Sequence, residues 1–151
     1  MNHWLIKSEP DVFSITDLQK VAQEPWSGVR NYQARNFMWK EMNIGDLALF
    51  YHSNATPPGI VGVARVASEP YPDPTQWDPA SEYFDEKSTE QKPRWWLVDF
   101  AFEKEFGQMV TLADLRAEAK LEGMVVLQKG TRLSITPVIK KHFDHIVKMG
   151  R

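Results

Sequence analysis

The stretch LALFYHSNATPPGIVGVARVA, residues 47–67, contains two apolar runs separated by a polar loop. The first run, Leu47–His52, shows no alternation of apolar and polar residues, which is typical of a strand buried on both faces. The second run, Gly59–Ala67, is rich in valine, and Gly62 within it predicts a bulge or a close backbone approach. Because the loop at Ser53–Pro58 is short, we expect the two strands to pair as a hairpin.

Shorter elements surround this hairpin in an irregular order. The patterns predict strands at residues 3–7, 95–102 and 132–135, and a strand or extended segment at 124–127. They also predict helices that begin at the caps Ser14, Asn31, Thr111 and Thr136. The last of these helices has Pro137 at its first position and ends at about Met149. No βαβ period repeats and no glycine-rich phosphate loop occurs, so a doubly wound fold does not fit. We predict an α+β fold, a small mixed β-barrel or strongly curved sheet flanked by helices.

Length and composition limit the class of protein. A chain of 151 residues with 42% hydrophobic and 25% charged residues predicts one globular domain, residues 1–151. No apolar run approaches the roughly 20 residues that span a bilayer, so we expect no membrane association. The absence of cysteine excludes disulfides, thiolate nucleophiles and cysteine zinc sites. Residues 1–7 lack the pattern of a secretory signal, which predicts a cytoplasmic location.

Charge is distributed unevenly along the chain. Between residues 69 and 91 seven acidic residues stand against one lysine, a local balance of −6, so the remainder carries +4 within a total of −2. This acidic segment also contains four prolines, which predicts a long excursion over the surface at residues 68–92. The remaining positive charge permits nucleic-acid binding but is far below that of domains that bind duplex DNA through phosphates alone.

The segment WSGVRNYQARN, residues 26–36, combines two large aromatic rings, two arginines, three side-chain amides and a glycine without one carboxylate. Aromatic rings stack on bases, amides read a base edge, and arginine holds phosphate or stacks. The predicted cap Asn31 places Arg30 at a helix amino terminus, which favours a phosphate or a carbonyl-rich edge. We interpret Trp26, in a loop beside Gly28, as an exposed stacking platform. The segment therefore predicts a nucleobase site.

Other polar residues leave alternatives open. His52 ends a buried strand and either lines a pocket or caps the strand. A hydrolase triad with Ser53 is disfavoured, because adjacent strand residues point to opposite faces and no nucleophile elbow is present. Glu9 suits acid–base chemistry and ligand binding equally. The histidines at positions 142 and 145 lack a third metal ligand, so we expect no metal site.

Six segments carry a resemblance to a known family. They are Trp4–Pro10, Trp26–Asn36, Phe50–Asn54, Pro58–Gly62, Tyr71–Pro74 and Gly130–Val138. Together they span nearly the whole chain in order and resemble the EVE domain family, with Thr131 and Ile135 where that family usually has serine and valine. The resemblance implies a PUA-like mixed β-barrel flanked by helices, related to YTH domains, with a pocket for a modified nucleobase and no catalytic activity, metal or cofactor.

The resemblance also implies roles for individual residues. Trp26 would stack on or wall the flipped base, while Lys7, Ser8 and Asn31 would offer hydrogen-bonding groups to its edge. The rim, with its contacts to sugar or phosphate, would be formed by Arg30, Tyr32, Arg35 and Asn36. The barrel side of the pocket would be closed by His52, Ser53, Arg132, Leu133 and Ser134.

The implied partner is DNA or RNA that carries a modified base, and 5-substituted cytosine in DNA is the first expectation. We expect no obligatory protein partner. The alternatives are a binder of modified RNA, an enzyme that acts on modified bases or nucleotides, and a protein-interaction module that uses the aromatic surface.

Overall fold

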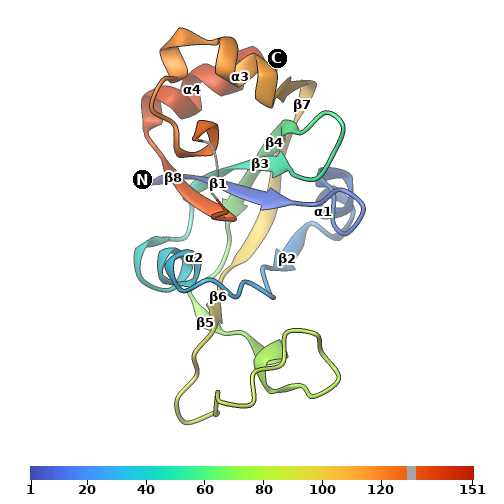
Figure 1. The fold of residues 1–151 in the computed structure, drawn as a ribbon, viewed down its shortest axis with the longest axis vertical. Coiled ribbons are helices and arrows are strands. Elements are labelled where there is room, and N and C mark those ends of the chain that lie inside the picture. Colours follow the sequence, from blue (N-terminus) through green and yellow to red (C-terminus); the bar gives the residue numbers. More distant parts are fainter. Residues whose placement is uncertain (129–131) are drawn as a thin grey trace.

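The computed structural model describes residues 1–128 and 132–151, so the predicted turn at Gly130 and residue Thr131 lie outside the described part. Within that part, six strands form one curved mixed sheet in the order β2-β7-β4-β3-β1-β8, with helices packed around it (Figure 1). The strands are β1 His3–Ser8, β2 Gln23–Pro25, β3 Leu47–His52, β4 Gly59–Val66, β7 Asp99–Thr111 and β8 Ile135–Val138. The prediction of an α+β fold with a barrel-like sheet is confirmed.

The hairpin predicted for residues 47–67 is confirmed. Strands β3 and β4 pair antiparallel, and their register shifts between Phe50 and Tyr51, opposite Gly62. A Cβ atom at Gly62 would collide with the backbone carbonyl of Lys104 on β7. Gly62 therefore permits both the bulge and the close approach of a third strand.

Both faces of this sheet are buried, which explains the unbroken apolar run in β3. On β1, Trp4 and Ile6 belong to one hydrophobic cluster, whereas Leu5 belongs to the other. The first cluster packs against α1, Ile15–Val21, and α2, Tyr32–Asn36; the second packs against α3, Leu112–Ala117, and α4, Lys140–Met149. In Figure 1, α3 and α4 lie at the upper end of the sheet.

The capping residues in the sequence predicted the starts of three of the four α-helices correctly. Ser14 and Asp17 form a capping box at α1, and Thr111 and Asp114 form another at α3. The side chain of Asn31 accepts a hydrogen bond from the backbone N–H of Ala34 and begins α2. A π-helical turn, Phe37–Glu41, continues α2 up to the position predicted for its end.

The carboxyl-terminal boundaries were predicted wrongly. Thr136 and Pro137 lie inside β8, and α4 begins at Lys140. Pro137 pairs with Trp4 in the outermost strand, where its missing N–H breaks no ladder bond to a further strand. The segment at 124–127, predicted as a strand or an extended segment, contains the 3₁₀ turn Val125–Leu127 instead.

The acidic excursion extends from the lower end of the sheet in Figure 1. It begins with β5, Tyr71–Pro72, which pairs with β6, Trp96–Leu97, and continues into the 3₁₀ turn Pro74–Trp77. Its interior is polar, because fully buried Gln76 accepts hydrogen bonds from the Ser88 hydroxyl and from two backbone N–H groups. No helix in the described residues is long and apolar enough to cross a membrane.

Candidate functional site

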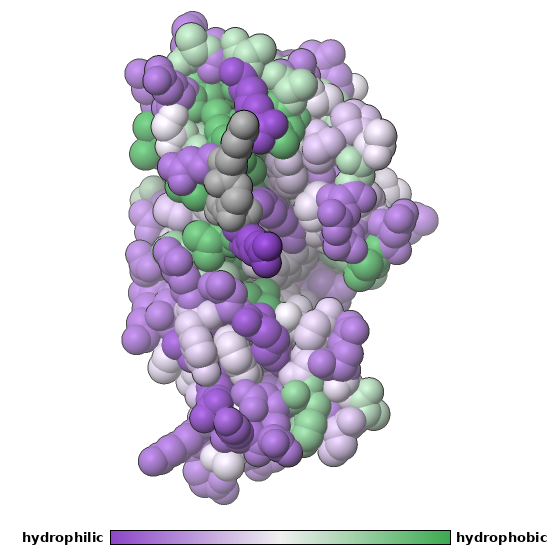
Figure 2. Space-filling model, in the orientation of Figure 1, coloured by the Kyte–Doolittle hydropathy of each residue, from purple (hydrophilic) through white to green (hydrophobic). Residues whose placement is uncertain are grey.

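The principal cavity lies where the end of β1, the segment that follows β2 and the acidic excursion meet. Its volume is about 590 Å³. Figure 2 shows the face of the molecule that is hollowed near its middle, with mainly hydrophilic residues around the hollow. The lining residues are Lys7, Ser8, Val12, Phe13, Glu24, Pro25, Trp26, Ser27, Gly28, Val29, Arg30, Asn31, Glu82, Tyr83 and Ser134.

Gly28 and Asp73 join two sides of this cavity. Gly28 has φ +85°, a left-handed conformation that favours glycine, and a Cβ there would lie 2.7 Å from the ring of Tyr83. The backbone N–H of Gly28 donates to Asp73 Oδ2 over 2.8 Å. The Asp73 carboxylate also accepts from the N–H and hydroxyl of Thr75, at 2.9 and 2.6 Å. The loop after β2 is therefore fixed to the excursion.

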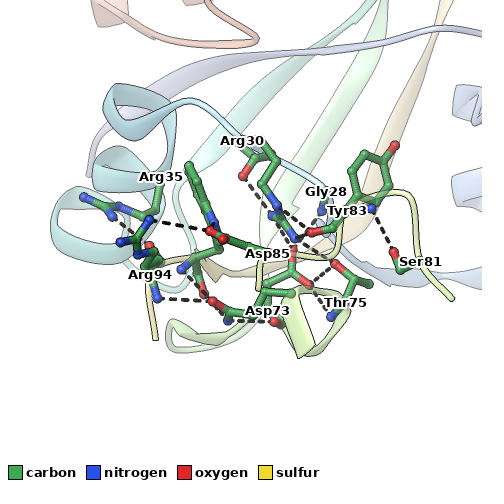
Figure 3. A network of polar contacts seen from close by, with 12 residues as sticks. Gly28, Arg30, Arg35, Asp73, Thr75, Ser81, Tyr83, Asp85 and Arg94 are labelled. Atoms are coloured by element: carbon green, nitrogen blue, oxygen red, sulfur yellow. Dashed lines mark hydrogen bonds and ion pairs between the residues drawn. The ribbon is translucent and has the colours of Figure 1, made fainter. Parts of the chain in front are cut away.

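Arg30 is the centre of a second set of bonds (Figure 3). Its Nη1 donates to Val29 O and to Asp73 Oδ2, each over 3.1 Å. Its Nε and Nη2 both donate to the Tyr83 carbonyl, and Nη2 also donates to the Thr75 hydroxyl. A guanidinium has five N–H donors, and all five are engaged here. Arg30 thus has no free donor for a phosphate, contrary to the role expected from the sequence.

Trp26 is buried rather than presented to solvent. Its side chain is 9% exposed, and its ring makes edge-on contacts with Phe13, Phe50 and Phe100 at centroid distances of 6.1, 5.9 and 5.3 Å. The predicted exposed platform is therefore wrong. Trp26 still lines the cavity, so it forms part of the wall while most of its surface belongs to the core.

The more exposed aromatic ring at the cavity is that of Tyr83, which was not among the residues predicted for the site. Tyr83 is 37% exposed, and its ring packs against Gly28. Arg30 lies 5.6 Å from the ring centroid. Phe13, which is half-buried, is a further aromatic lining residue. Neither ring was predicted from the sequence. Tyr83 lies in the acidic excursion and reaches the cavity only through tertiary contacts.

Two half-buried ionisable groups at the cavity, Lys7 and Glu24, lack a charged partner among the described residues. Burial lowers the pKa of Lys7, whose Nζ lies 5.9 Å from the centroid of the Tyr51 ring. Burial and, to a smaller extent, the charge of Asp99 raise the pKa of Glu24. Neither side chain forms an ion pair with another described residue. Burial favours the neutral form of a lysine when no nearby anion offsets it. It favours the neutral form of a carboxyl group in the same way when no cation is nearby.

Three further predicted residues lie at the cavity, but each has local bonds. The Ser8 hydroxyl donates to the Phe13 carbonyl over 2.5 Å. Asn31 uses its side-chain oxygen to cap α2, which leaves its amide N–H groups for other partners. The carbonyl of Ser134 accepts from the backbone N–H of Lys7 over 2.9 Å. The bonds of Ser8 and Ser134 fix the end of β1 in the cavity wall, and that of Asn31 fixes the start of α2.

Tyr32, Arg35 and Asn36 lie on α2 beside the cavity rather than in its lining. Tyr32 is 52% exposed and stacks on Trp95, with ring centroids 4.8 Å apart. The Arg35 guanidinium lies 4.6 Å from the Tyr32 centroid and bonds to the Asn36 side-chain oxygen and the carbonyl of Arg94. These bonds use three of its five N–H donors, so two remain.

Four other predicted residues do not line the cavity. His52 is 9% exposed, and its Nε2 accepts the N–H of Ile15 over 3.2 Å, so it caps α1. Its neighbour Ser53 donates its backbone N–H to the Ser8 carbonyl. Arg132 is exposed and Leu133 is half-buried. The sequence left open whether His52 lines a pocket or caps its strand; in the structure its imidazole caps the helix α1 instead.

Residues considered for other chemistry lie elsewhere. The carboxylate of Glu9 accepts a hydrogen bond from the side-chain amide of Asn54 over 2.5 Å. His145 lies 3.3 Å from a carboxylate oxygen of Glu118 on the far side of the sheet, near α3. Among the residues that the structure describes, no group of three or more histidine or acidic side chains is arranged to hold a metal ion.

Comparisons with known proteins identify what this arrangement is similar to. A family model described as EVE domain matches residues 2–149. Thymocyte nuclear protein 1 of Homo sapiens is 37% identical over 167 residues, which cover 98% of this chain and 73% of that protein. A crystal structure of a Pseudomonas syringae protein superposes with a TM-score of 0.93 and 44% identity, covering 99% of both chains. The crystal structure of human THYN1 in complex with DNA containing 5-methylcytosine gives a TM-score of 0.92 and 38% identity, covering 100% of this chain and 98% of that one.

Proposed function

This chain belongs to the EVE domain family, and from that premise we propose that it is a non-catalytic module that binds DNA carrying a modified nucleobase, a 5-substituted cytosine. The relative that superposes on all of this chain was crystallised with DNA containing 5-methylcytosine. At 38% identity and a TM-score of 0.92, a shared binding mode is the simplest expectation.

The cavity is the observation that carries the proposal. Its volume of about 590 Å³ lies within the range of about 300–1,000 Å³ that is usual for small-ligand sites. Aromatic surface from Phe13, Trp26 and Tyr83 lines it together with a few polar groups. Stacking surface combined with a small number of hydrogen-bonding groups is what a flipped base requires.

We place the phosphate contacts outside the cavity. Two carboxylates, Glu24 and Glu82, line it, and Arg30 is fully engaged. Next to the cavity, α2 carries Arg35, and the π-helical turn that follows carries Lys40, whose Nζ lies 4.8 Å from the Trp39 ring. Cations stacked on aromatic rings beside a base cavity suit the sugar–phosphate backbone of a strand whose base is extruded. The roles predicted for Tyr32, Arg35 and Asn36 at the rim stay proposals of this kind.

A binding function is preferred to catalysis because the residues considered for acid–base chemistry have structural partners. His52 caps α1 and Glu9 bonds to Asn54. An enzyme acting on modified bases would convert its ligand, whereas a binding module returns it unchanged. Mass analysis of modified oligonucleotides after incubation with the protein distinguishes the two.

The experiment that tests the proposal is a binding screen across single- and double-stranded oligonucleotides. Each oligonucleotide carries one cytosine that is unmodified or substituted at its 5-position, in DNA and RNA versions of the same sequence, at stated salt. We expect the DNA with the substituted cytosine to bind most tightly. Equal affinity for modified and unmodified DNA would overturn the proposal, and preference for the RNA series would favour the modified-RNA alternative. The cytoplasmic location stays a prediction. The name of the relative from Homo sapiens, Thymocyte nuclear protein 1, describes that protein as nuclear.

A further inference from the structure

Glu24 is a lining residue of the cavity for which the sequence offered no role. It lies in the middle of β2, a three-residue strand at the edge of the sheet. Its side chain is half-buried, and no hydrogen bond or ion pair to another described residue engages its carboxylate. A carboxylate that is partly desolvated without a partner costs stability, so it is retained more readily where it meets a ligand.

The strand register fixes the direction of this side chain. Glu24 pairs with Phe100 of β7, and directly paired residues of antiparallel strands project to the same face. Phe100 belongs to the same hydrophobic cluster as Trp26, and their ring centroids lie 5.3 Å apart. Glu24 therefore projects toward the side of the sheet on which Trp26 forms the cavity wall.

The charges in the cavity select the kind of group that Glu24 can accept. The guanidinium of Arg30 is paired with Asp73, and the Lys7 ammonium lies near the Tyr51 ring. Glu82 adds a second carboxylate at the lining. Next to Glu24 the cavity therefore favours an N–H donor, because an ionised carboxylate only accepts hydrogen bonds.

We propose that Glu24 reads the edge of the bound base by accepting a hydrogen bond from its exocyclic amine, so that the cavity selects 5-methylcytosine over thymine. This inference rests on the proposed function. The two bases carry the same 5-methyl group and have nearly the same shape. Cytosine presents an amino donor at C4, whereas thymine presents a carbonyl acceptor there, which a carboxylate repels.

The comparison of these two bases gives a test that isolates one hydrogen bond. Two single-stranded DNA oligonucleotides of one sequence carry either 5-methylcytosine or thymine at a single position. We expect the parent protein to bind the 5-methylcytosine strand at least about tenfold more tightly, the size of a good base-edge contact. In Glu24→Gln the amide donates as well as accepts, so we expect the ratio to fall toward one, chiefly through tighter binding of the thymine strand.

Two further variants control this result. Glu69→Gln makes the same change of charge at an exposed residue that does not line the cavity, and we expect it to keep the parent ratio. Glu24→Asp keeps the carboxylate but shortens it, so the preference should keep its sign while the affinity falls. Thermal unfolding of each variant shows that the fold is retained.

The outcomes separate this inference from the proposed function. If the parent discriminates tenfold and Glu24→Gln retains that ratio, another group reads the base and the inference fails while the proposed function stands. Equal binding of both strands by the parent, at an affinity above that for unmodified cytosine, also refutes it alone. If the parent binds no modified strand better than the unmodified one, the proposed function and this inference fail together.

Discussion

The guanidinium of Arg30 lies 3.1 Å from the carboxylate of Asp73, and the Asp73 side chain is only 2% exposed. The pair connects the loop after β2 to the acidic excursion, two segments separated by 43 positions in the sequence. The same carboxylate also accepts a hydrogen bond from the backbone N–H of Gly28, and it therefore holds the backbone beside Trp26 in place. The shape of the cavity therefore depends on this ion pair.

We expect Arg30→Ala to reduce the free energy of unfolding by about 3 kcal/mol, because it leaves a buried carboxylate without its cation. Urea denaturation measures this loss. Arg30→Lys is the matched control: it keeps the charge but cannot bond to Tyr83, Thr75 and Asp73 together, so its stability should lie between those of the parent and Arg30→Ala. If Arg30→Ala is as stable as the parent and its DNA binding depends less steeply on salt, Arg30 is instead a phosphate contact.

Tyr83 provides the cleanest test of base stacking. We expect Tyr83→Ala to weaken binding of the modified oligonucleotide by about 1–3 kcal/mol, the usual value of one base–aromatic contact. Arg30 bonds to the carbonyl of Tyr83 and not to its hydroxyl, so this substitution leaves those hydrogen bonds in place. Tyr83→Phe keeps the ring and should retain the affinity. Titration of a labelled strand measures both, and an unchanged affinity of Tyr83→Ala would remove the stacking role.

Trp26→Ala, by contrast, is a test of stability. The indole contacts Phe13, Phe50 and Phe100 within the core. Its removal should lower the free energy of unfolding by about 3–5 kcal/mol, as for other large core aromatics. Trp26→Phe should cost clearly less, since it keeps apolar contacts with the same rings. A Trp26→Ala protein as stable as the parent in urea would show that the ring contributes little to the core.

Local signals in the sequence were enough to predict much of the fold. Capping residues such as Ser14 and Asn31 act on backbone groups within three positions, so their pattern is visible without tertiary structure. The unbroken apolar run of β3 likewise reflects burial on both faces. Thr136 and Pro137 misled the prediction because a helix start and an edge strand tolerate the same residues, and only pairing with β1 decides between them.

The candidate site was only partly predictable, because its walls come from distant segments. Trp26 stands in a loop beside Pro25, and nothing local reveals that Phe50 and Phe100 enclose its ring. Tyr83 lies in a segment whose composition suggested only a surface excursion. Glu24 occupies a strand too short for periodicity to indicate its direction, which follows only from its pairing with Phe100.

His52 predicts how stability depends on pH. Burial lowers the pKa of His52, and the charge of Glu105 offsets only part of this effect. The neutral ring accepts the Ile15 N–H, whereas a protonated ring has no lone pair for it. The unfolded chain therefore binds a proton at His52 more readily than the folded chain does. Its contribution to stability is complete above about pH 6.5, the usual histidine pKa, and is lost as the pH falls below that value.

Urea denaturation between pH 7.5 and pH 5 measures this dependence. Each such histidine contributes a slope of at most about 1.4 kcal/mol per pH unit, and His3, whose pKa is also lowered chiefly by burial, adds to it. In His52→Gln a side-chain oxygen can accept the Ile15 N–H without titrating, so the slope below pH 6.5 should become smaller while that of His3 remains. A slope identical to that of the parent would mean that His52 keeps its ordinary pKa in the folded protein, and that α1 does not depend on its neutral form.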